Sequence, residues 1–131
     1  MIVADASVVL ELLLQTPRAA AIHARLFRRG ESIHAPALID IEVAQVLRRY
    51  LHRAELDQAR ARVSMQLLAA MPLMRYHHEP LLPRIWELRE NLTAYAAAYV
   101  ALAEGLRAPL VTCDARVARA AGPRATIEVI Q

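Results

Sequence analysis

Two carboxylic acids stand at positions where they could share a metal ion. Asp5 ends the apolar run 1–5, and Asp114 ends the apolar run 108–114. Both runs are typical of short, buried strands of a parallel sheet, and each acid lies where its strand gives way to a helix. The carboxyl ends of parallel strands form the edge where open α/β sheets bind ligands. We therefore expect the two acids to be neighbours, and like charges that converge need a shared cation or proton.

A third acid comes from a helix. A proline opens segment 36–50, and its apolar residues repeat at helical spacing. Glu42 lies beside that apolar stripe, where a solvent-exposed acid is not expected. Asp40 points to another side of the helix, and its place in the first turn predicts a favourable interaction with the helix dipole. Carboxylates at these three positions suit a hard divalent cation, which prefers oxygen ligands.

The elements that must position these acids follow the pattern of an α/β sandwich. Strands alternating with helices predict a parallel sheet flanked by helices. Three glycines leave no glycine-rich phosphate loop, and no internal repeat or second domain is visible, so residues 1–131 form one predicted domain. The expected strands are 2–5, 32–35, 73–77, 109–112 and 126–130, and the expected helices are 6–15, 17–29, 36–53, 55–70, 81–91, 93–106 and 114–121.

Composition narrows the function classes. No apolar run approaches the ~20 residues that a membrane span needs, and the start of the chain lacks the basic region of a signal peptide. We therefore expect a cytoplasmic protein without a membrane partner. All sixteen basic residues are arginine, and the net charge is +3. This balance suits a phosphate-backbone partner, with Arg116 and Arg119, just after Asp114, best placed to contact RNA.

With these residues in place, the chain resembles the PIN-domain ribonucleases, and most closely the VapC toxins of toxin–antitoxin pairs. The resemblance implies a three-layer sandwich with a central parallel sheet of about five strands. It also implies an endoribonuclease that depends on Mg²⁺ or Mn²⁺ and cleaves structured RNA, such as transfer or ribosomal RNA. The matching segments span nearly the whole chain in the family's order: Ile2–Ser7, Ala35–Val43, Asn91–Ala103 and Leu110–Gly122.

The resemblance also assigns the site, residue by residue. Asp5, Glu42 and Asp114 match acidic metal-site positions. The remaining acidic position, the aspartate of a Thr-x-Tyr-Asp-Ala-x-Tyr pattern, is Ala96 here. The rest of that pattern is intact, so we interpret Ala96 as a single Asp→Ala change that abolishes or strongly reduces cleavage. The alternative is a naturally non-catalytic module that binds RNA or an antitoxin.

Other residues near the acids have weaker signals. Ser7, Thr112 and Arg116 flank the acidic positions and could contact a ligand or water, although helix caps and strand-end hydrogen bonds explain the first two equally well. Tyr95 and Tyr99 lie four residues apart and predict a packing stripe along their helix. A receiver-like phosphoacceptor domain also clusters aspartates at strand ends, but its chemistry depends on a lysine, and this chain has none.

The resemblance further implies partners. We expect a homodimer and a small VapB-like antitoxin, which together would form a heterotetramer or a larger assembly. The helices carry more apolar residues than one small core needs, and exposed apolar patches mark interfaces. The residues that we expect to be exposed for this reason are Leu26, Phe27, Leu47, Tyr50, Leu51, Met65 and Leu68.

Overall fold

The fold is built on one parallel sheet, seen in a computed structural model that describes the whole chain, residues 1–131. Its strand order is β3-β2-β1-β4-β5, and every pairing is parallel. The predicted α/β class with about five strands is therefore confirmed. The strands are β1 (Ile2–Ala4), β2 (Ile33–Pro36), β3 (Leu73–Tyr76), β4 (Leu110–Thr112) and β5 (Ile127–Val129).

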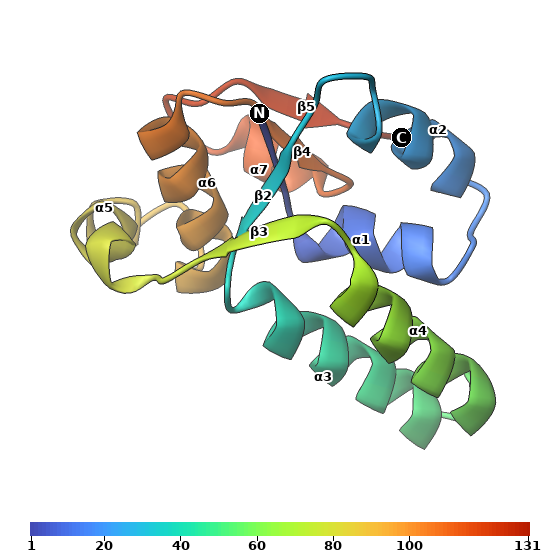
Figure 1. Cartoon of the computed structure of the whole chain (residues 1–131). Coiled ribbons are helices and arrows are strands. Elements are labelled where there is room, and N and C mark those ends of the chain that lie inside the picture. The colour runs from blue at the N-terminus through green and yellow to red at the C-terminus, as the bar shows by residue number, and fades with distance from the viewer.

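Helices cover both faces of the sheet. In Figure 1, α5 and α6 lie on one side and α1 and α2 on the other, while α3 and α4 form a pair that projects below. All seven predicted helices are present, with ends that differ by a few residues. They are α1 (Ala6–Leu13), α2 (Ala19–Leu26), α3 (Ile39–His52), α4 (Gln58–Ala70), α5 (Leu82–Glu87), α6 (Ala94–Leu106) and α7 (Ala115–Arg119), with a 3₁₀ turn at Glu79–Leu81.

The buried core fixes the positions of the carboxyl ends of the strands. β1 is the central strand, and all three of its residues are fully buried. Helix α6 is buried at seven consecutive positions, 97–103, because it is packed between the sheet and α5. The alanines among these positions let α6 approach the sheet closely. The start of α6 and the ends of β1 and β4 are thus fixed relative to one another.

The expectation of surplus apolar surface was partly wrong. Leu26 is fully buried, and Leu47 and Leu68 are each only 2% exposed. Their helices pack against neighbouring elements, so these leucines belong to the core. Phe27 and Met65 are each 39% exposed, as expected. No helix of this structure has both the length and the apolar character needed to cross a membrane.

Candidate active site

Asp5 is held in place by hydrogen bonds from three residues. It follows β1 directly and caps the N-terminus of α1, where its Oδ1 accepts from the backbone N–H groups of Ser7 (3.0 Å) and Val8 (3.3 Å). The Ser7 hydroxyl also donates to Oδ1, and the Thr112 hydroxyl donates to Oδ2. Burial raises the pKa of Asp5 above its ordinary value, although these hydrogen bonds act in the opposite direction. The carboxylate is therefore well oriented, but its negative charge is poorly solvated.

Glu42 approaches the same region from α3. Its Oε1 accepts a hydrogen bond of 2.7 Å from the hydroxyl of Tyr99 on α6. Burial raises the pKa of Glu42, the Tyr99 hydrogen bond lowers it, and the charge of Asp5 raises it again. The influence of Asp5 shows that the two carboxylates share one electrostatic neighbourhood. Burial, followed by the charge of Glu42, raises the pKa of Tyr99, so the phenol keeps its proton and acts as a donor.

Position 96 belongs to the first turn of α6. Thr93 is the N-cap, and its side-chain oxygen accepts a hydrogen bond of 3.1 Å from the backbone N–H of Ala96. Ala96 is partly buried against the core and precedes Tyr99 by three residues. Residues three apart are neighbours on one face of a helix, so position 96 lies on the face of α6 that contacts Glu42.

Asp114 lies at the same edge of the sheet but has a different partner. It follows β4, caps α7, and binds Arg116 in a two-pronged ion pair with N–O distances of 2.9 and 3.0 Å. This hydrogen bonding by Arg116 lowers the pKa of Asp114. A link to Asp5 runs through Thr112, whose hydroxyl oxygen accepts from the Asp114 backbone N–H at 3.0 Å and donates to Asp5.

The donor chemistry of the edge fits a divalent cation in part. Asp5 and Glu42 are partly buried carboxylates that influence each other electrostatically, and hard oxygen ligands of this kind suit Mg²⁺ or Mn²⁺. No group of three or more His, Cys, Asp or Glu side chains lies close enough together to hold a metal ion. Of the three acids expected to converge, Glu42 is influenced by the charge of Asp5, and Asp114 is paired with Arg116. The metal-binding role of all three stays a prediction.

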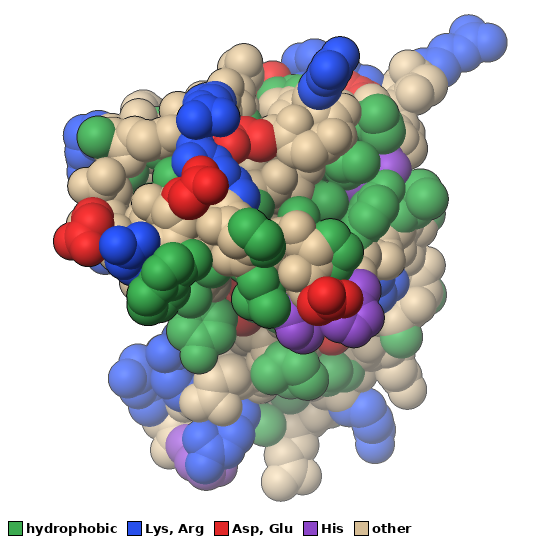
Figure 2. Space-filling view, turned by 90° about the vertical axis from the view of Figure 1, so that its left-hand side faces the viewer, with side chains coloured by type: hydrophobic (Ala, Val, Ile, Leu, Met, Phe, Trp, Pro, Cys, Tyr) green, Lys and Arg blue, Asp and Glu red, His purple; other side chains and the backbone are tan.

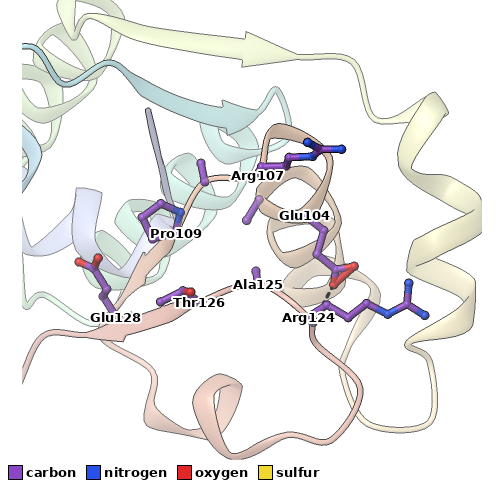
Figure 3. A pocket seen from close by; sticks show the side chains of 9 residues that line it. Glu104, Arg107, Pro109, Arg124, Ala125, Thr126 and Glu128 are labelled. Atoms are coloured by element: carbon purple, nitrogen blue, oxygen red, sulfur yellow. Dashed lines mark hydrogen bonds between the residues drawn. The ribbon is translucent and has the colours of Figure 1, made fainter.

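A cavity of about 550 Å³ lies at the opposite edge of the sheet, away from these acids. Figure 3 shows its walls at the amino ends of β4 and β5, where the backbone N–H of Arg124 donates to Glu104 at 3.0 Å. Because β4 and β5 run parallel to β1, this cavity is separated from Asp5 by the length of the strands. The labelled lining residues are Glu104, Arg107, Pro109, Arg124, Ala125, Thr126 and Glu128.

Comparison with known proteins identifies the fold and the family. The PIN domain family model matches residues 2–123. The chain is 42% identical over 130 residues to Ribonuclease VapC12 of Mycobacterium tuberculosis, covering 99% of both chains. This chain belongs to the PIN-domain family, among the VapC ribonucleases. Ribonuclease VapC9 of the same organism is 41% identical, with 99% of this chain and 98% of that protein covered.

Solved structures give the same fold. VapBC2 from Rickettsia felis, bound to a DNA fragment from their promoter, matches with a TM-score of 0.72 at 13% identity, covering 100% of both chains. FitAcB from Neisseria gonorrhoeae matches with a TM-score of 0.68 at 16% identity, covering 98% of this chain and 96% of that one. PIN-domain ribonucleases generally depend on divalent metal ions.

The accessory residues have structural roles. The Ser7 hydroxyl oxygen, besides donating to Asp5, accepts a hydrogen bond of 2.9 Å from the backbone N–H of Cys113. Ser7 and Thr112 thereby join the ends of β1 and β4 and aim Asp5, as the strand-end interpretation expected. Arg116 contacts Asp114 and is otherwise exposed.

Sequence reasoning missed Tyr99 as a site residue. The predicted packing stripe holds for Tyr99, which is 3% exposed, but is wrong for Tyr95, which is 65% exposed. The hydroxyl of Tyr99 has a more specific role, because it binds Glu42. Its place one helical turn after position 96 was the signal that could have identified it. Asp40 lies in the first turn of α3 as expected, and its ion pair with Arg75 of β3 at 2.7 Å was not predicted.

Proposed function

We propose that this protein is the toxin of a toxin–antitoxin pair, an endoribonuclease that uses Mg²⁺ or Mn²⁺ to cleave structured RNA such as transfer or ribosomal RNA. One observation carries the proposal: Asp5 and Glu42 are partly buried carboxylates with raised pKa values, and the charge of Asp5 acts on Glu42, in a chain 42% identical to a VapC ribonuclease. Such a pair lowers the stability of the fold, because each charge is poorly solvated. A functional role would explain why it is present.

The surrounding residues prepare this pair for phosphodiester hydrolysis. The hydrogen bonds from Ser7 and Thr112 fix the orientation of Asp5, and Tyr99 fixes that of Glu42. Held by these carboxylates, a divalent ion would supply an activated water molecule and neutralise charge developing on the scissile phosphate. Fixed ligand geometry matters because an error of about 1 Å can cost ~100-fold in rate.

The alanine at position 96 supports the proposal that RNA cleavage by this chain is reduced. It lies on the face of α6 that contacts Glu42, where a short acid would add a carboxylate to the pair. Alanine keeps the backbone of this turn and supplies no oxygen ligand. We propose that Asp5, Glu42 and Asp114 are the metal ligands and that the missing acid makes cleavage slow or absent.

The second candidate is a naturally non-catalytic module that binds RNA or an antitoxin. The ion pair between Asp114 and Arg116 favours it, because a neutralised carboxylate is a weaker metal ligand. The absence of a group of three metal-ligating side chains points in the same direction.

We further propose partners and setting. A small VapB-like antitoxin would bind a homodimer of this chain, giving a heterotetramer or a larger assembly. The fold-level match to VapBC2 and FitAcB supports this assignment. Residues 1–131 would act as one domain in the cytoplasm, where toxin and RNA meet.

The deciding experiment restores the missing acid. Purified protein is incubated with total bacterial RNA and Mn²⁺, and cleavage by this chain is compared with that by Ala96→Asp and by Ala96→Asp combined with Asp5→Ala. We expect Ala96→Asp to cleave faster by on the order of 100-fold or more, and the combined variant to be inactive. Equal cleavage by this chain and Ala96→Asp would refute the missing-ligand argument. If neither cuts any RNA, the binding-module candidate takes the lead.

A further inference from the structure

A dense group of arginines lies at the far end of the α3–α4 pair. Of the sixteen arginines in the chain, six form ion pairs with acids, and none of those six lies in this region. Residues 48–62 hold five arginines against two acids, a net charge of +3, which equals that of the whole chain. We name the exposed, unpaired members the α3–α4 arginine patch: Arg48, Arg49, Arg53 and Arg62.

Part of this patch is aligned with the candidate active site. An α-helix advances 100° per residue, so positions seven and eleven residues after Glu42 return to within about 20° of its direction. Those positions are Arg49 in the last turn of α3 and Arg53 at its C-cap. They lie about 10 Å and 16 Å from Glu42 along the helix axis. Glu42, Arg49 and Arg53 therefore form a single row that begins at the carboxylate pair.

The arrangement is visible in the overall views. Figure 1 shows α3 starting near the first turn of α6 and running away from the sheet. In Figure 2, which faces α5 and α6, arginine and histidine side chains stand out on the lower part of the molecule, where α3 and α4 project. The helix thus connects the site to a cationic surface outside the body of the fold.

We propose that the α3–α4 arginine patch binds the sugar–phosphate backbone of the RNA substrate on one side of the cleavage point. The inference rests on the proposed function and names the surface that holds the substrate. Guanidinium groups bind phosphate in a two-pronged manner and without base specificity. The row of Arg49 and Arg53 leads to the carboxylate pair. It therefore suits an RNA strand whose backbone lies along the row while its scissile phosphate lies at Asp5 and Glu42. An acidic protein segment would also bind the arginines, but it has no phosphodiester that could be cleaved at Asp5 and Glu42.

The test measures binding rather than cleavage, with Ala96 retained and EDTA present. Fluorescence anisotropy follows a short single-stranded RNA of mixed sequence across salt concentrations of about 50 to 200 mM. Arg49→Gln/Arg53→Gln is compared with a matched control, Arg29→Gln/Arg107→Gln. Arg29 and Arg107 are also exposed and without ion pairs, but they precede β2 and β4 at the opposite edge of the sheet. Both double variants lose the same charge.

Losing two phosphate contacts should reduce the slope of log affinity against log salt by about 1.4 for single-stranded RNA, which corresponds to about 25-fold weaker binding at 0.1 M salt. The control Arg29→Gln/Arg107→Gln should keep most of the salt dependence of the RNA affinity. The variant Arg49→Lys/Arg53→Lys, which retains both charges, should restore most of it. Thermal melts establish that each variant is folded, and Arg53→Gln alone replaces the double variant if that one is not.

Equal losses in the two double variants would overturn the proposal, because only the total charge would then matter. Unchanged RNA binding in Arg49→Gln/Arg53→Gln would also overturn it and point to an acidic protein partner for this surface. The proposal would also be overturned if neither this chain nor any of the variants bound RNA. The proposed function is tested separately, since cleavage by Ala96→Asp can succeed or fail whatever surface holds the RNA.

Discussion

Tyr99 and Glu42 join α6 to α3 by a hydrogen bond, with the phenol oxygen 2.7 Å from Oε1 of the carboxylate. Both groups are withdrawn from water, and burial raises the pKa of each. A donor with a raised pKa cannot lose its proton to the acid that it contacts. The bond therefore fixes Glu42 as an acceptor, in a position where the charge of Asp5 also acts on it.

Replacing Tyr99 with phenylalanine should destabilise the protein and disturb the site. The change leaves a partly buried carboxylate without its donor, which costs about 1–3 kcal/mol in the free energy of unfolding. The pKa of Glu42 should rise further, because the Tyr99 hydrogen bond now lowers it. Urea unfolding at neutral pH provides the measurement. Tyr95→Phe is the control: Tyr95 is 65% exposed, and its loss should cost less than about 0.5 kcal/mol. Equal losses in both variants would remove the special role of Tyr99.

The raised pKa values of Asp5 and Glu42 predict how stability depends on pH. In the unfolded chain the pKa values of these groups are about 3.9 and 4.3. Their folded pKa values are higher, so between the unfolded and folded values the folded state binds more protons. Their contribution to the free energy of unfolding therefore falls as pH rises through this window and is constant above it.

His34 acts in the opposite direction, so a comparison of variants is needed. Burial lowers the pKa of His34, which lies 2.7 Å from the Tyr76 hydroxyl, and its contribution to stability is lost as pH falls below about 6.5. We expect Asp5→Asn to gain stability relative to this chain at pH 7 and to lose that advantage as the pH approaches 4. Unfolding in urea at a series of pH values measures the difference. A difference that does not change with pH would show that Asp5 is not destabilised by burial.

The ion pair between Arg116 and Asp114 should weaken the binding of a divalent cation at the proposed metal site. Arg116 neutralises the carboxylate and lowers its pKa. Removing the guanidinium in Arg116→Ala should raise the pKa of Asp114 and free its oxygens, so Mn²⁺ should bind more tightly. The rise in melting temperature with Mn²⁺ concentration measures that affinity. Arg119→Ala, which removes a nearby charge that forms no hydrogen bond with Asp114, should have a smaller effect. The reverse order would mean that Asp114 lies outside the metal site.

The sequence predicted the backbone of this site better than its side-chain partners. Asp5 and Asp114 were placed correctly at strand ends, because buried parallel strands are continuous apolar runs and the next residue is free to be polar. Partners were missed where they join distant segments. Tyr99 meets Glu42 across 57 positions, and Asp40 meets Arg75 across 35. Helical periodicity shows which face of a helix is apolar, but it does not show which polar atom of another helix meets that face.

The same limit applies to the leucines on the helices. Leu26, Leu47 and Leu68 were expected at an interface because the chain has more apolar residues than one small core needs. The projecting α3–α4 pair and the contacts between α1 and α2 bury them instead. How many faces a helix buries depends on its neighbours, which the local pattern does not specify.

The last prediction concerns the metal-free and metal-bound stability of Ala96→Asp. Without metal, a third carboxylate beside Asp5 and Glu42 adds repulsion and burial cost, so this variant should melt at a lower temperature than the present chain. One effect opposes this. Thr93 caps the backbone N–H of position 96 at 3.1 Å, and an acid there could complete a reciprocal cap worth about 0.5–1 kcal/mol.

The variant Ala94→Asp separates the two effects. Position 94 is the first residue of α6 and is exposed, so an acid there interacts favourably with the helix dipole without joining the site. We expect Ala94→Asp to melt at or above the temperature of this chain, and Ala96→Asp below it. Saturating Mn²⁺ should raise the melting temperature of Ala96→Asp most, since binding at 100 times Kd adds about 2.7 kcal/mol to the folded state. If metal-free Ala96→Asp melts as high as Ala94→Asp, capping outweighs repulsion, and position 96 lies too far from Asp5 and Glu42 to share a cation with them.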